Sequence, residues 1–148
     1  MRAPRRGAFT LIELLVALLI LGVLGAGAGL RVWTFHTPQR EADRAMRWLY
    51  GVLARADRTG QSFSLHIGDG RPSCLVAIRD GLGESERLEA SEGCSFERRL
   101  SDIANVTYSP QWGTFTAAMT IRVRGAGGGA HYLILSGQGR LRTAPSPN

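Results

Sequence analysis

A long uncharged stretch near the N-terminus constrains this chain more than any other feature. The residues from Leu14 to Leu30 carry no charge, and the apolar segment from Phe9 to Leu30 would be about 33 Å long as a helix. That length is enough to cross a bilayer core of about 30 Å. The arginines before the segment favour a cytoplasmic N-terminus, which puts the rest of the chain on the other side of the membrane. The sequence therefore predicts a single-pass membrane segment over residues 9–30.

One acidic residue, Glu13, lies near the start of this apolar segment. A carboxylate inside a membrane is costly unless a partner neutralises it, so an intramembrane acid is a functional hypothesis by default. If the chain is cut just before Phe9, the new α-amino group of a neighbouring subunit can neutralise Glu13. The alternative is removal of the whole segment after Ala28, because Ala26-Gly27-Ala28 has the small-x-small pattern of a secretory cleavage site.

A basic leader, the run Phe9-Thr10-Leu11-Ile12-Glu13 and an apolar helix follow one another in this order. This order resembles the leader junction shared by type IV prepilins and type II secretion pseudopilins. The resemblance implies that a prepilin peptidase removes residues 1–8, cutting between Ala8 and Phe9, and methylates the new N-terminal Phe9. It also implies that Glu13 acts in filament assembly. The family usually has Gly before the cut, but cutting after Gly7 would move Glu13 one residue out of register, so we favour cleavage after Ala8.

An amphipathic continuation of the helix is predicted over residues 31–60. Pro38 should kink or interrupt it, and beyond this residue apolar side chains recur every three or four positions. Charged residues such as Glu41 and Arg44 are assigned to the solvated side. The apolar stripe consists of Ala42, Ala45, Met46, Leu49, Val52, Leu53 and Ala56. Gly60 is the predicted stop, and the apolar face is expected to pack on a sheet.

Residues 61–148 are predicted to form a β-rich globular domain in the periplasm, because the apolar period changes to two after Ser62. Strands are expected at 63–67, 74–78, 95–98, 106–108, 120–124, 131–135 and 139–142. The predicted class is α+β with a pilin-like arrangement, in which a long N-terminal helix, transmembrane and then amphipathic, packs on a small antiparallel β-sheet domain.

Cys74 and Cys94 are the two cysteines of the chain. A disulfide between them would close a loop of about 20 residues and stabilise the fold by about 3 kcal/mol in an oxidising compartment. Two buried thiols are the alternative. A metal site would need more ligands than the chain clusters anywhere, so no metal and no other cofactor is expected.

The sequence contains no catalytic motif. The three histidines are scattered, no nucleophile motif or HExxH lies near them, and the glycine runs lack the strand and helix context of a phosphate loop. We therefore expect a structural subunit, not an enzyme, which polymerises by helix packing and presents a domain.

The second half of the chain resembles the GspH/FimT group of minor subunits, on residues 108–114, 120–123, 131–136 and 139–142. The resemblance implies a minor pseudopilin near the tip of a type II secretion pseudopilus, anchored in membrane lipid at the inner membrane. Its expected partners are other (pseudo)pilin subunits, the prepilin peptidase and the inner-membrane assembly platform. The alternative is a FimT-like minor type IV pilin that binds DNA for natural transformation.

Two pairs of arginines carry the DNA-binding alternative. Gly139-Arg140-Leu141-Arg142 fits the Gly-Arg-x-Arg pattern associated with DNA binding in the FimT-like subgroup, and in a strand Arg140 and Arg142 share one face, as do Arg122 and Arg124. The formal net charge is +6, but without the three leader arginines fifteen basic residues face twelve acidic ones, which leaves +3. Because that charge is small and the same ending occurs in secretion-type relatives, we favour the secretion interpretation.

Overall fold

The computed structural model describes residues 11–32, 37–81, 83, 85–99 and 105–147, and the chain divides into two compact units between Phe35 and His36. The N-terminal unit contains helix α1, Leu11–Val32. The large apolar side chains of α1 are exposed over the part whose side chains are described, residues 11–23. Within the described residues, no helix combines the length and the apolarity that a membrane span requires.

Helix α2, Pro38–Thr59, opens the second unit, and local chemistry sets both of its ends. Thr37 is the N-cap: its hydroxyl oxygen accepts a hydrogen bond of 3.4 Å from the N–H of Arg40. Pro38 occupies the first helical position, where the missing N–H has no intrahelical partner to lose. Gly60 ends the helix with a φ of 68°, which confirms the predicted stop. Pro38 thus begins a separate helix, and residues 33–36 lie outside the described part of the chain.

The strands form two antiparallel sheets in the described residues, where one sheet was expected. The first sheet has the order β3 (Ser85–Glu89), β2 (Cys74–Arg79), β1 (Phe63–Gly68), β5 (Asn105–Ser109), β6 (Thr114–Phe115). The second has the order β4 (Cys94–Arg98), β7 (Met119–Gly125), β8 (Ala130–Leu135), β9 (Leu141–Ala144). The division arises because β4 pairs with β7 and not with β3, its neighbour in the sequence.

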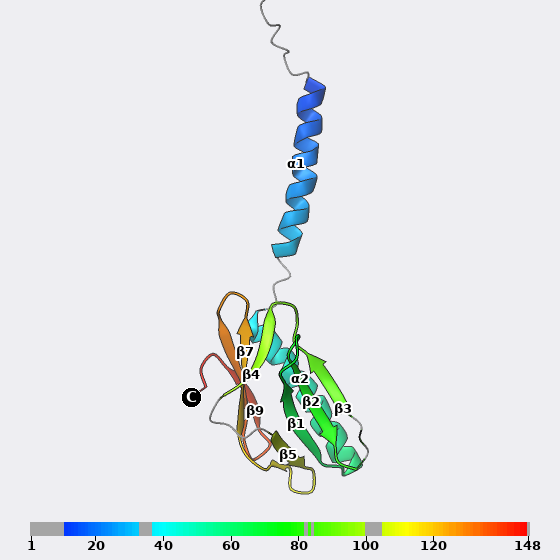
Figure 1. The fold of residues 1–148 in the computed structure, drawn as a ribbon, viewed down its shortest axis with the longest axis vertical. Coiled ribbons are helices and arrows are strands. Elements are labelled where there is room, and N and C mark those ends of the chain that lie inside the picture. The colour runs from blue at the N-terminus through cyan, green and yellow to red at the C-terminus, as the bar shows by residue number, and fades with distance from the viewer. Residues whose placement is uncertain (1–10, 33–36, 82, 84, 100–104, 148) are drawn as a thin grey trace, which may run out of the picture. The chain divides into compact units, whose positions relative to one another are not determined.

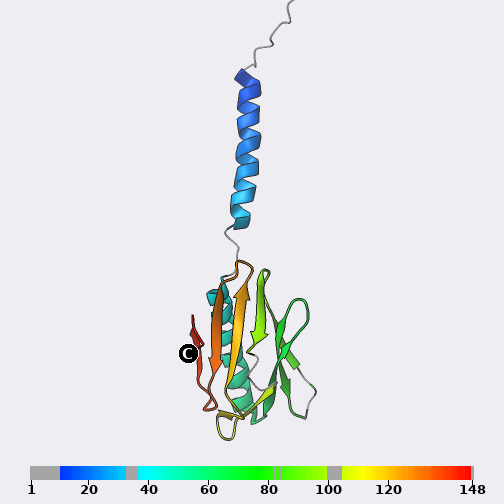
Figure 2. The same ribbon diagram turned by 60° about the vertical axis from the view of Figure 1, so that its left-hand side comes forward.

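One hydrophobic core joins α2 to both sheets, and α2 runs along the strands of the second sheet (Figures 1 and 2). Leu49 and Leu53 of α2 are buried in it, as the predicted stripe requires. Three aromatic rings of the first sheet pack together there, with centroids 5.5 Å apart for Phe63 and Tyr108 and 5.1 Å for Tyr108 and Phe115. The helices and antiparallel sheets confirm the α+β class.

Candidate functional site

The acidic residue assigned to filament assembly lies in the first turn of α1. The side chain of Glu13 is exposed, and a negative charge at this position complements the helix dipole. The large side chains that follow it, from Leu14 to Val23, are also exposed. Over residues 11–23, where its side chains are described, α1 therefore presents one carboxylate on an otherwise apolar surface. Ala8 and Phe9, the predicted cleavage pair, lie outside the described residues.

Three of the four candidate DNA-binding arginines lie on one face of the second sheet. Arg122 and Arg124 of β7 and Arg142 of β9 alternate with buried residues such as Val123 and Leu141. Since successive strand residues point to opposite faces, and the strand pairing keeps register across β7, β8 and β9, the three arginines point away from the core. The structure thus brings Arg122, Arg124 and Arg142 onto a common surface, which we call the arginine face.

Arg140 lies in the turn before β9 and not in the strand. β9 begins at Leu141, so the predicted strand over 139–142 starts two residues too early. The cause is Gly139, whose φ of 76° is left-handed and ends the turn. A Cβ at Gly139 would overlap the carbonyl oxygen of Gly113 in the turn between β5 and β6. The glycine is therefore required where the two turns touch.

A carboxylate from β4 reduces the positive charge of the arginine face. The Glu97 oxygens lie 3.9 Å from Nη1 of Arg122 and 3.8 Å from Nη1 of Arg124. Exposed ion pairs at this distance contribute about 0–1 kcal/mol to stability. Their effect on binding is larger than their effect on folding, because any phosphate that approaches the two arginines also approaches Glu97.

The two cysteines begin strands of different sheets, Cys74 in β2 of the first sheet and Cys94 in β4 of the second. Cys74 is a buried thiol whose sulfur packs on Gly68, its partner across the β1–β2 pair, so that a Cβ at Gly68 would lie 2.6 Å from this sulfur. Cys94 is half-buried, and its burial, helped by the negative charge of Glu41, raises the pKa of its thiol. Since Cys74 is a thiol here, the Cys74–Cys94 disulfide stays a prediction.

A polar centre at Glu41 was not predicted from the sequence, and the prediction that this residue lies on the solvated side of the helix is wrong. Glu41 is 0% exposed, and it is the one polar or charged side chain among the buried residues that the structure describes. Its carboxylate accepts hydrogen bonds from the N–H of Ser91 at 3.0 Å, from the Ser91 hydroxyl at 2.8 Å and from Arg44 at 2.7 Å. These bonds replace the water that a buried carboxylate loses.

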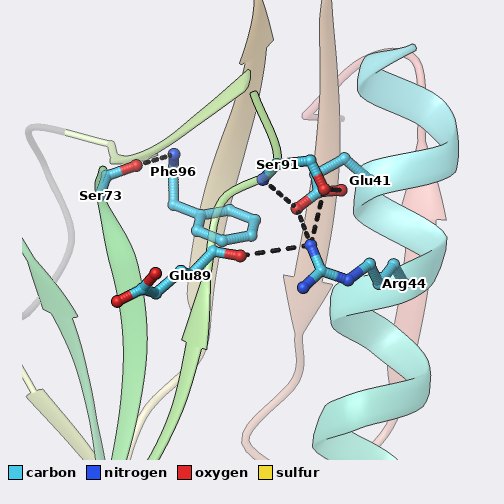
Figure 3. Close-up of polar contacts among 6 residues, drawn as sticks. All are labelled: Glu41, Arg44, Ser73, Glu89, Ser91 and Phe96. Carbon is cyan, nitrogen blue, oxygen red and sulfur yellow. Dashed lines mark hydrogen bonds and ion pairs between the residues drawn. The ribbon is translucent and has the colours of Figure 1, made fainter. Parts of the chain in front are cut away.

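Arg44 completes this centre from the next turn of α2 (Figure 3). The same Nη1 atom of Arg44 also lies 2.8 Å from the Ser91 hydroxyl oxygen and 3.2 Å from the carbonyl oxygen of Glu89, so its two N–H groups are shared among three acceptors. The loop between β3 and β4 is thereby held against the first turns of α2. The arrangement has the satisfied, charge-assisted bonds of a structural anchor.

A family model described as the prokaryotic N-terminal methylation motif matches residues 4–29. The motif indicates a type IV pilin-like or pseudopilin protein. Neither a curated protein nor a solved structure matches the chain. Proteins with this motif are structural subunits that a prepilin peptidase processes and that assemble with other pilin subunits. The motif also indicates that the pilin-like protein is anchored in a membrane.

The two histidines that the structure describes lie in different sheets. His66 lies in β1 of the first sheet and His131 in β8 of the second. No group of three His, Cys, Asp or Glu side chains in the described ranges is placed to hold a metal ion. The surfaces that remain as functional candidates are the apolar surface of α1 with Glu13 and the arginine face.

Proposed function

We propose that this protein is a minor pseudopilin of the GspH/FimT group, which assembles into the pseudopilus tip of a type II secretion system and helps to export folded proteins across the outer membrane. The observation that carries the proposal is the methylation motif over residues 4–29, continued by α1 with Glu13 in its first turn. The separate domain, a helix packed on antiparallel sheets, supports it because a filament subunit needs a part to present outside the helical bundle.

In the proposed arrangement, residues 9–30 anchor the precursor in the inner membrane, with the leader over residues 1–8 in the cytoplasm and the second unit in the periplasm. The prepilin peptidase then cuts before Phe9 and methylates it. The exposed apolar side chains of α1 are unfavourable in water. In this arrangement lipid covers them before assembly, and neighbouring helices cover them afterwards. Glu13 is neutralised by the α-ammonium group of a neighbouring subunit.

The test of this proposal is the chemical identity of the mature N-terminus. The full chain is expressed with a prepilin peptidase, and its N-terminus is determined by intact-mass measurement and N-terminal sequencing. We expect a protein that begins at N-methylated Phe9. A start at Ala8 would move the junction, and a start after Ala28 would replace filament assembly by ordinary secretion.

DNA uptake is the second candidate, and the arginine face is the observation that favours it. Arg122, Arg124 and Arg142 point from one sheet face, with Arg140 exposed in the adjoining turn. We propose secretion ahead of it because Glu97 lies beside two of these arginines and the mature net charge is only +3. Three or four neutralised phosphates would give a log–log salt slope of about −3 to −4.

The two candidates are separated by titrating labelled double-stranded DNA at two salt concentrations, with the parent protein and with an Arg140→Gln/Arg142→Gln variant. We expect negligible binding of both proteins at physiological salt. Micromolar or tighter binding that is lost in the variant would refute the secretion proposal and favour DNA uptake.

A further inference from the structure

The start of α2 is held from two sides by loops that are also bonded to each other. We call this arrangement the clasp and define it by Pro38 and Glu41 of α2, Ser91 and Gly93 of the β3–β4 loop, and Gly125 at the end of β7. Its contacts all lie within the second unit, and the chain enters that unit at His36, directly before the clasp.

One side of the clasp is polar. The buried Glu41 carboxylate accepts two hydrogen bonds from Ser91, one from the backbone N–H and one from the hydroxyl. Ser91 lies 50 residues further along the chain, so these bonds join the first turns of the helix to a distant loop. Hydrogen bonds to a charged group are about twice as strong as neutral ones, and leaving a buried carboxylate unpaired is costly.

The other side of the clasp is a close apolar contact. A Cβ added at Gly125 would lie 2.8 Å from Cγ of Pro38, so the glycine allows the end of β7 to lie directly on the first residue of the helix. The two sides are connected, because the N–H of Ala126 donates to the carbonyl oxygen of Gly93 at 2.6 Å. The β3–β4 loop and the β7–β8 turn therefore hold α2 as a single unit.

We propose that the clasp is a tension stop, which keeps α2 on its domain when the chain before Thr37 is pulled or unwinds. This inference rests on the proposed function, because a filament subunit is held through its N-terminal helix. A load applied at one end of a packed helix breaks its contacts in order from that end. The contacts at Pro38 and Glu41 therefore decide whether the helix peels away or the whole domain resists as one body.

The direct test is single-molecule pulling on the full chain in detergent micelles, with one handle at residue 36 and the other at the C-terminus. α1 then lies outside the loaded segment, which matters because it has the same 22 residues as α2 and its unwinding would release the same length. The parent domain should unfold in one step. Glu41→Gln removes the negative charge and one of the two acceptor oxygens that bind Ser91 and Arg44. It should add an earlier step that releases about 40 Å, the difference between α2 extended and α2 helical. Gly125→Ala, whose Cβ displaces Pro38, should add the same step.

Each variant has a matched control. Glu92→Gln makes the same chemical change on an exposed side chain beside Ser91, and Gly127→Ala adds a methyl group in the same turn as Gly125 where no atom lies within 4 Å. Both controls should unfold like the parent. An early 40 Å step in the parent, or its absence from both clasp variants, would overturn the tension stop.

Amide hydrogen exchange separates local anchoring from general stabilisation. In Glu41→Gln the first amides of α2 that are bonded within the helix should exchange about tenfold to a hundredfold faster, while amides of β1 and β7 keep the parent rates. Equal acceleration in all three elements would mean that Glu41 only stabilises the domain, and would refute the proposal. Neither measurement requires a filament. Both would therefore still test the tension stop if the proposed role in secretion were wrong.

Discussion

α1 and α2 are both 22 residues long, yet they differ in how far their apolar side chains are buried. α2 buries a stripe of side chains against two sheets, whereas the large side chains described in α1 are exposed. Contacts within the second unit therefore pack the apolar stripe of α2, and no contact within the N-terminal unit covers the described apolar side chains of α1. The difference teaches that α2 is packed by its own unit, while under the proposed function α1 is packed by lipid or by neighbouring helices.

An acidic residue from each of the two units gives the largest expected contrast. Glu13→Ala should leave membrane insertion intact, since the segment becomes more apolar, but should abolish most incorporation into the filament because a partner ammonium loses its counter-charge. Co-purification with the other filament subunits measures this loss. Glu92→Ala, which removes an exposed carboxylate of the second unit, is the control and should be incorporated normally. Undiminished incorporation of Glu13→Ala would remove the role assigned to that residue.

Truncating one leucine in each helix tests the same contrast through stability. Leu49 is 0% exposed in α2, so Leu49→Ala should lower the free energy of unfolding of the second unit by about 2–5 kcal/mol. Leu15 is 57% exposed in α1, and Leu15→Ala should change that free energy by less than about 0.5 kcal/mol. Urea denaturation in detergent measures both. Equal effects would show that the stability of the second unit depends on α1.

A Cys74–Cys94 disulfide would increase the difference in stability between the two units, because both cysteines lie in the second unit. Protein recovered from the periplasmic side should contain one intramolecular Cys74–Cys94 bond, worth about 3 kcal/mol. Non-reducing mass spectrometry detects it, with Cys74→Ser as the control that cannot form it. The prediction fails if native protein yields two alkylatable thiols. The raised pKa of the Cys94 thiol means that the bond should form faster as the pH rises toward that pKa.

The smallest predicted effect concerns the hydrogen bond of 2.8 Å from Tyr108 to Asp57 of α2. Burial, this bond and the nearby carboxylate charge raise the pKa of Tyr108 to about 12. Because the folded-state pKa is raised, the stabilisation is complete below about pH 10, the ordinary tyrosine value, and is lost as the pH rises toward 12.

Tyr108→Phe should lower the free energy of unfolding by about 1 kcal/mol at neutral pH and should flatten its decline between pH 10 and 12. Urea titrations at a series of pH values measure this. Tyr50, which is 49% exposed, provides the control through Tyr50→Phe. If the free energy of unfolding declines equally in both variants between pH 10 and 12, the decline is due to groups other than Tyr108.

Periodicity was sufficient to predict α2 and most strands, because it reports which side chains must leave water. It failed where the apolar signal is weak. β3, Ser85–Glu89, has Leu88 as its single apolar residue and lies at the edge of its sheet, and β6 has only two residues. Glu41 was missed for a different reason, since its partner Ser91 is distant in the sequence. The one local sign was that Glu41 lies four residues before Ala45, on the same face of the helix.

The arginine face was only partly predictable. Alternation correctly put Arg122 and Arg124 on one side of a strand, but it could not show that β9 adds Arg142 to that side or that Glu97 approaches from β4. Both facts depend on which strands become neighbours. Strand order is a property of the whole chain, and no local pattern specifies it.

The contact between the two turns at Gly113 and Gly139 has a consequence for how proteins of this kind are recognised from their genes. Because the left-handed Gly139 lies against a backbone oxygen, any chain that builds this corner needs a glycine there, whatever the filament does. A search that uses Gly-Arg-x-Arg as a marker of DNA uptake therefore selects partly for a corner of the architecture. The residues that bear on DNA binding are the two arginines and the side chains beside them. A genome survey should score these residues separately from the glycine.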